Sequence, residues 1–162
     1  MTLEEYQDVI QQFVRYAPTA ERQYLALGLV AEIGELSGKF AKRLRSDFVS
    51  DADVIAELGD ILWFVRMIRN RYRANWQASV KTIRIRHADD AIGKLFEFGQ
   101  QVYSDMQRDT VAPVYLCLIE DVIEHLAKLH GVKSLADLAT ENFDKLQGRA
   151  ERGVIVGSGD AR

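Results

Sequence analysis

The chain contains two near copies of one short acidic motif, and this repeat restricts the fold more than any other feature of the sequence. Residues 31–36 read AEIGEL and residues 56–61 read AELGDI. In each copy two acids lie three positions apart, which places them on one face of a helix. Apolar residues recur around them with the 3.6-residue helical period. The repeat therefore predicts two helices that each carry a pair of acids beside an apolar face.

The acids of the two motifs are predicted to form a metal site. Glu32 and Glu57 share their helix faces with large apolar residues, so partial burial of their carboxylates is expected. A buried carboxylate is costly without a partner, and several together repel one another unless a cation intervenes. Mg²⁺ prefers oxygen ligands and also accepts phosphate oxygens. The predicted metal ligands, with Mn²⁺ as the alternative ion, are Glu32, Glu35, Glu57 and Asp60.

The rest of the chain also has helical periodicity, and strand-like alternation is scarce. Capping residues and apolar spacing predict an all-α bundle of five to six helices in a single domain over residues 1–162. The expected helices run from Thr2 to about residue 16, from Thr19 to about 44, from Ser50 to at least 68, over about 88–107, from near Pro113 to before 131, and from Ser134 to about 148.

Composition excludes several classes of protein. The 162 residues are 48% hydrophobic and 28% charged, which is ordinary for a globular domain. The net charge of −3 gives no overall basic field for nucleic acid. The single cysteine, Cys117, excludes an internal disulfide and is expected in the core. No apolar run approaches the roughly 20 residues of a membrane span, so a cytoplasmic protein without membrane contact is expected.

A basic segment stands apart from this acidic background. Residues 69–87 carry several arginines interleaved with Tyr72 and Trp76. Arginine with aromatic residues can bind single-stranded nucleic acid. A solvated connector with two docked aromatic rings explains the same pattern and is favoured, because the segment is short and the remaining chain is acidic.

Two parts of the sequence resemble a known superfamily. AEIGELSGK with ELGDILWFV is similar to the all-α nucleoside triphosphate pyrophosphohydrolases of the MazG-like superfamily. The segment ENFDKLQGRAERGVIVGSGDAR resembles the N-x-x-K-L-x-x-R segment and the R-G-x-x-x-G-S-G-D-x-R tail of one branch. The likeness covers about residues 20–68 and 124–162. Residues 70–120 are not covered, so the resemblance implies a MazG-like core with an inserted helical segment there.

The resemblance implies an activity and a set of substrate ligands. The reaction would be (d)NTP + H2O to (d)NMP and pyrophosphate, for house-cleaning or control of the nucleotide pool, by a homodimer or homotetramer. Glu32, Glu35, Glu57 and Asp60 would hold the metal and be the catalytic residues. Residues expected to bind the nucleoside triphosphate are Asn142, Lys145 and Arg149 in the helical motif, Asp160 and Arg162 in the tail, and Lys39 one turn beyond Glu35.

A non-catalytic helical binding protein is the alternative. Its acids would form an ion-pair network with Lys39, Lys42 and Arg43 instead of binding a metal. Loss of activity in EDTA distinguishes the enzyme from such a network.

Small and apolar residues add two further expectations. Gly34 and Gly59 lie between the acids of each pair, and a glycine inside a helix costs about 1 kcal/mol relative to alanine. Both are therefore expected where a backbone or a ligand approaches closely. Leu27, Val30 and Ile33 make the residue 19–44 helix apolar on nearly every side, which predicts at least a dimer.

Overall fold

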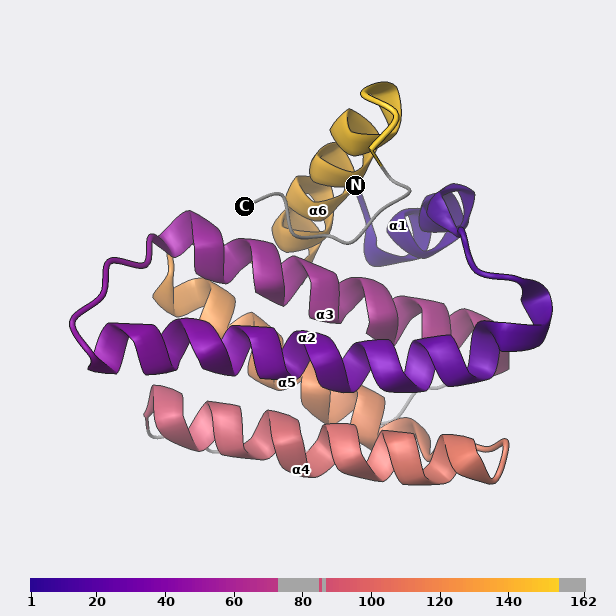
Figure 1. Ribbon diagram of the computed structural model, residues 1–162, viewed down its shortest axis with the longest axis horizontal. Helices are drawn as coiled ribbons and strands as arrows, with labels where there is room; N and C mark the ends of the chain where they lie inside the picture. Colours follow the sequence, from indigo (N-terminus) through magenta and orange to yellow (C-terminus); the bar gives the residue numbers. More distant parts are fainter. Residues whose placement is uncertain (73–84, 86, 155–162) are drawn as a thin grey trace.

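The computed structural model describes residues 1–72, 85 and 87–154, and these form helices without a strand. The prediction of an all-α bundle is confirmed (Figure 1). None of the helices in these ranges is long and apolar enough to cross a membrane. The α-helices are α1 (Leu3–Val9), α2 (Glu21–Leu44), α3 (Asp51–Tyr72), α4 (Ala88–Gln107), α5 (Pro113–Leu129) and α6 (Leu135–Glu151), and the 3-10 helices are η1 (Ile10–Phe13) and η2 (Pro18–Ala20).

Four helices enclose the core and two cover it. α2 packs against α3 and α4, and α5 packs against the same two helices from the other side. α6 and α1 lie together on the outer side of α3, at the top of Figure 1. Residues 88–120, most of the segment expected as an insertion, supply α4 and part of α5 and therefore form two sides of the core.

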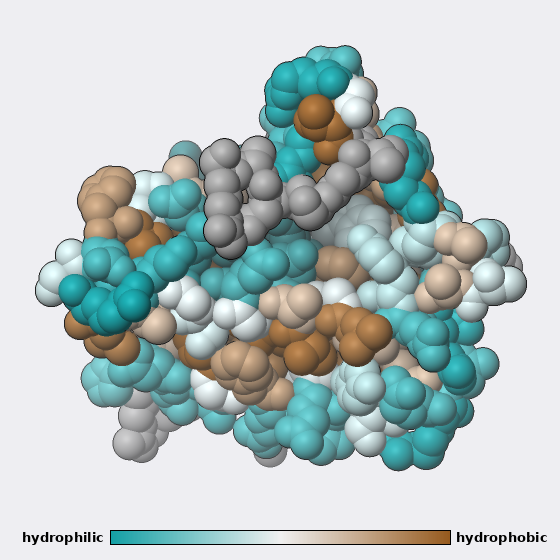
Figure 2. Space-filling model, in the orientation of Figure 1, coloured by the Kyte–Doolittle hydropathy of each residue, from teal (hydrophilic) through white to brown (hydrophobic). Residues whose placement is uncertain are grey.

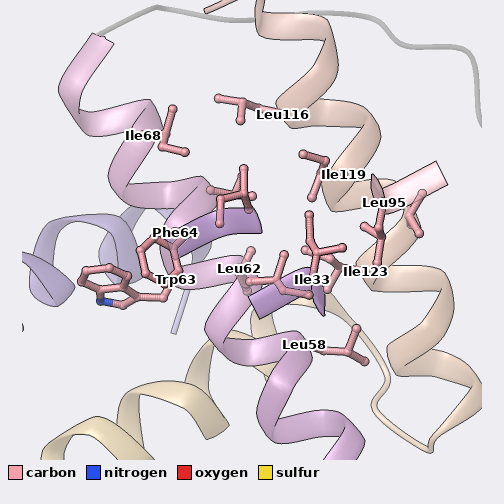
Figure 3. Close-up of a cluster of buried hydrophobic side chains, with 14 of the residues drawn as sticks. Ile33, Leu58, Leu62, Trp63, Phe64, Ile68, Leu95, Leu116, Ile119 and Ile123 are labelled. Carbon is pink, nitrogen blue, oxygen red and sulfur yellow. The ribbon is translucent and has the colours of Figure 1, made fainter. Parts of the chain in front are cut away.

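α3 is the central helix of the bundle. Residues 61–68 are all buried, because α2, α5, α6 and α1 each contact this helix. In Figure 3, Leu116 and Ile119 of α5 face one side of α3, while Trp63 lies on the opposite side. The acids of α3 lie in its first half, where α2 and α6 both pack against it.

Three of the predicted helix starts are capped as expected and two boundaries differ. Thr2 forms a capping box with Glu5, and the hydroxyls of Ser50 and Ser134 each accept a hydrogen bond from the backbone N–H three residues further on. The first helix was expected to reach about residue 16 but ends at Val9, where a 3-10 turn begins. Thr19 does not cap α2, because it lies inside the 3-10 turn η2 and the chain enters α2 already in a helical conformation.

α2 is apolar on its buried side and also on part of its outer side. Leu25, Leu29 and Ile33 are buried in the core, whereas Leu27 is 60% exposed. Ile33 therefore needs no cover from a second chain: its side chain lies against Gly99 of α4, where an added Cβ would come within 2.6 Å of it.

Candidate metal and substrate site

α2 and α3 form a helical hairpin that brings the two acidic motifs together. Each of Glu32, Glu35 and Glu57 offers a carboxylate oxygen, and the three oxygens lie within 4.8 Å of one another. Glu57 is buried, Glu32 is half-buried and Glu35 is exposed. Three of the four predicted ligands therefore form one close group that opens to solvent on the Glu35 side.

Glu32 has the most strongly altered electrostatics in this group. Burial raises its pKa to about 8, and the neighbouring charges of Asp60, Glu35 and Glu57 add to this rise. Lys145 acts in the opposite direction. The pKa of Glu57 is also raised, first by burial, while Lys39 partly offsets the rise. The surroundings therefore disfavour full ionisation of these carboxylates unless another cation is present.

Two lysines already neutralise part of this charge. Lys39 Nζ lies 3.3 Å from Glu57 Oε1, one turn along α2 from Glu35. Lys145 Nζ lies 2.6 Å from both oxygens of Asp60 and 3.3 Å from the Ala56 carbonyl oxygen. Asp60 is not part of the close group of three found among the described residues, and its carboxylate is bound by Lys145.

Asn142 positions Asp60 and does not face open solvent. It is 3% exposed, and its Nδ2 donates to Asp60 Oδ1 at 2.9 Å. The Tyr6 hydroxyl in turn donates to Asn142 Oδ1 at 2.7 Å. Asn142, expected as a substrate ligand, therefore acts in this structure as a support that links α1 and α6 to Asp60.

The two motif glycines have different surroundings. A Cβ added at Gly59 would lie 2.9 Å from Asn142 Nδ2, so this glycine allows α6 to approach α3. A Cβ at Gly34 would meet nothing within 4 Å. The expected close approach is confirmed at Gly59, but no part of the described chain approaches Gly34.

An aromatic pocket lies beside the acids, and it was not predicted from the sequence. Its volume is about 220 Å³, and Glu32, Asp60 and Arg149 form part of its wall. Trp63 also lines the pocket, and its buried indole N–H has no hydrogen-bond partner in the described part of the chain. The pocket is further lined by the rings of Phe13, Tyr16, Tyr24 and Phe64.

The rings are held by packing that the sequence indicates only in part. The Tyr16 and Tyr24 ring centroids are 4.6 Å apart, and Trp63 meets Phe64 edge-on at 4.9 Å. Gly28 makes room for Phe64, because an added Cβ would lie 2.2 Å from that ring. The position of Trp63 three residues after Asp60, on the same face of α3, is the one local signal for this pocket.

Not all of the other predicted cations lie at this site. Arg149 faces the aromatic pocket, but Arg43 binds Asp51 and the Val49 carbonyl at the end of the hairpin. Lys42 is exposed. Of the three cations in the alternative ion-pair network, Lys39 alone pairs with one of the four acids among the described residues. Asp160 and Arg162 lie outside the described residues.

The described part of the basic segment is engaged in ion pairs within the bundle. Arg69 Nη2 lies 2.7 Å from Glu120 Oε2, and Arg66 Nη2 lies 3.0 Å from Glu120 Oε1. Arg71 pairs with Glu21 and Asp109. The cluster of Arg66, Arg69 and Glu120 was not predicted, and half-buried Cys117 lies at its edge, where its sulfur accepts from Arg69. The rest of the segment, including Trp76, lies almost entirely outside the described residues.

No family model, curated protein or solved structure matches this chain.

Proposed function

We propose that this protein is a Mg²⁺-dependent nucleoside triphosphate pyrophosphohydrolase of the MazG-like type, which converts a (d)NTP to the monophosphate and pyrophosphate. The observation that carries the proposal is the meeting of Glu32, Glu35 and Glu57 within 4.8 Å. Clustering acids in this way is unfavourable for a purely structural helix pair. A site that binds a divalent cation accounts for it.

The donor set suits a hard divalent ion. All three close ligands are carboxylates, which Mg²⁺ and Mn²⁺ prefer, and the exposed side at Glu35 leaves room for water or phosphate oxygens. When bound, such an ion neutralises phosphate charge and lowers the pKa of an attacking water. The protein's own task is to orient the carboxylates, which the α2–α3 hairpin and the Asn142 support perform.

Cations beside the acids support a triphosphate as the ligand. Lys145 and Arg149 lie one turn apart on α6, and both border the carboxylate site. Lys39 lies on the α2 side. Phosphoryl transfer depends mainly on positioning and charge neutralisation, which this mixture of acids and cations provides. A guanidinium at Arg149 can bind two phosphate oxygens at once.

The aromatic pocket is the proposed place for the base. It adjoins Glu32 and Asp60, so a base held there would leave its phosphates over the carboxylates. Bases stack on aromatic rings, which the pocket offers in Tyr16 and Tyr24. Trp63 lines the same pocket, and its buried N–H, which lacks a partner among the described residues, would donate to a carbonyl or ring nitrogen of a base that enters the pocket.

The outer face of α2 supports a homo-oligomer. Leu27, Val30 and Phe96 are exposed and line an apolar groove of about 550 Å³ between α2 and α4. Figure 2 shows the corresponding hydrophobic patch between these two helices. Contiguous apolar surface of this kind marks interaction sites. We propose that this face pairs with a second copy in a homodimer or homotetramer.

The direct test is product analysis. The purified protein is incubated with a panel of NTPs and dNTPs, with Mg²⁺ or with EDTA. We expect pyrophosphate and a nucleoside monophosphate in equal amounts, from a subset of the panel, and no product in EDTA. Release of inorganic phosphate and a diphosphate, or turnover that EDTA leaves unchanged, would contradict the proposal.

A matched pair of variants connects the activity to this site. Glu57→Gln keeps the size of the side chain but removes one carboxylate, and we expect it to lose most Mg²⁺-dependent turnover. Glu97→Gln makes the same change at an exposed position of α4, away from the site, and should keep wild-type kcat/KM.

A further inference from the structure

Lys145 pairs with Asp60, the predicted metal ligand that lies outside the close group of three acids. Its ammonium contacts both Asp60 oxygens at 2.6 Å, and Oδ1 also accepts from Asn142 at 2.9 Å. An ammonium has three donors, and the Ala56 carbonyl takes the third. A divalent ion and an ammonium bound to the same carboxylate would repel each other strongly at this separation.

The ammonium can move while the helix that carries it stays in place. The backbone of α6 is positioned by Asn142, which is bound to both Tyr6 and Asp60, and by its close approach to Gly59. The lysine stem is flexible, with the charge at the end of four carbons. It also borders a second cavity of about 210 Å³ between α3 and α6. Release of Asp60 therefore requires a change of side-chain rotamer only.

We propose that Lys145 is a resident counter-ion of Asp60 that divalent-ion binding displaces, and that the released ammonium then binds the triphosphate. The inference rests on the proposed metal-dependent function and adds a role for this residue within it. Lys145 stabilises the acids in the metal-free protein and changes partner when metal and nucleotide arrive. The charge of Lys145 therefore weakens binding of the divalent ion and strengthens binding of the triphosphate.

The test measures the two affinities separately by calorimetry. Lys145→Met keeps a side chain of similar length without the charge. With Mn²⁺ alone as the probe, the variant should bind at least about fivefold tighter than wild type, because the competing cation is gone. With inorganic tripolyphosphate in saturating Mg²⁺, it should bind more weakly than wild type. Lys42→Met, which removes an exposed charge from α2, should change neither affinity by more than twofold.

Thermal unfolding gives a second readout that does not depend on turnover. The variant should have a lower Tm than wild type in EDTA and gain more from added Mg²⁺, since its acids lack their resident cation. Weaker Mn²⁺ binding, or unchanged Mn²⁺ binding, by a folded Lys145→Met protein would overturn the inference. So would tighter Mn²⁺ binding with unaltered tripolyphosphate affinity. Absence of any Mn²⁺ binding by wild type would overturn the proposed function as well.

Discussion

Gly59 of α3 and Asn142 of α6 lie so close that a Cβ on the glycine would approach Asn142 Nδ2 to 2.9 Å and its Cβ to 3.0 Å. This contact sets the distance between the two helices at the site. Asn142 cannot simply move away, since it is buried between Tyr6 and Asp60.

Gly59→Ala is therefore expected to destabilise the protein although alanine favours helices. Overpacking should cost about 1–3 kcal/mol in the free energy of unfolding, measured in urea. Gly93→Ala is the control, because a Cβ at Gly93 meets none of the described residues within 4 Å. This change should raise the free energy of unfolding by up to about 1 kcal/mol. Equal stabilisation by both substitutions would show that α6 does not pack against Gly59 as described.

The raised pKa of Glu32 predicts that the free energy of unfolding of the metal-free protein depends on pH. Its folded pKa is about 8 against an ordinary value of 4.5, so between these values the folded state keeps a proton that the unfolded state has lost. The free energy of unfolding should therefore fall as the pH rises from 5.5 to 8, and Glu32→Gln should remove at least about 1 kcal/mol of that fall. Urea unfolding in EDTA at both pH values measures the difference. Parallel pH profiles for the two proteins would contradict the burial and repulsion assigned to Glu32.

Trp63→Phe tests the aromatic pocket. The substitution keeps an aromatic ring but removes the unpartnered N–H, so KM for the nucleotide should rise by about threefold to tenfold, the net value of one hydrogen bond. Mn²⁺ affinity should not change, because the carboxylates are untouched. Tyr103→Phe, in the α2–α4 groove, serves as the control. An unchanged KM in Trp63→Phe would place the base elsewhere.

Leu27→Glu tests the proposed pairing face. A charge in the α2–α4 groove should shift the protein to monomer in light scattering at micromolar concentration, since its partner surface is apolar. Leu44→Glu makes the same change at a residue of α2 that is 80% exposed but outside the groove, and should leave the oligomer intact. A wild-type monomer, or an oligomer that Leu27→Glu leaves unaffected, would rule out this face.

The sequence was most informative where the signal is local. Helical periodicity, the Thr2 and Ser134 caps and the spacing of the acids predicted the helices and the pair of acids on each, because each depends on neighbours within a few turns. The Glu32–Glu35–Glu57 group was predicted by assuming that the helices of the two matched motifs pack together. Gly34 and Gly59 show the limit of that reasoning. Their local motifs are alike, yet only Gly59 lies under a crossing helix.

The remainder of the site depends on contacts between distant parts of the chain. Lys145 reaches Asp60 across 85 residues, and Tyr6 reaches Asn142 across 136. The aromatic pocket is lined both by Phe13 and Tyr16, near the N-terminus, and by Trp63 of α3. No periodicity within one helix indicates which helices cross, so the resident ammonium on Asp60 and the pocket could not be predicted from spacing alone.

The central claim is that Glu32, Glu35 and Glu57 together bind a divalent cation. Anomalous diffraction from crystals soaked in Mn²⁺ tests this most directly, because it locates the ion independently of activity. We predict an anomalous peak between these three carboxylates, with Lys145 Nζ moved away from Asp60. Crystals without a peak at this cluster at saturating Mn²⁺, with Lys145 still bound to Asp60, would contradict it.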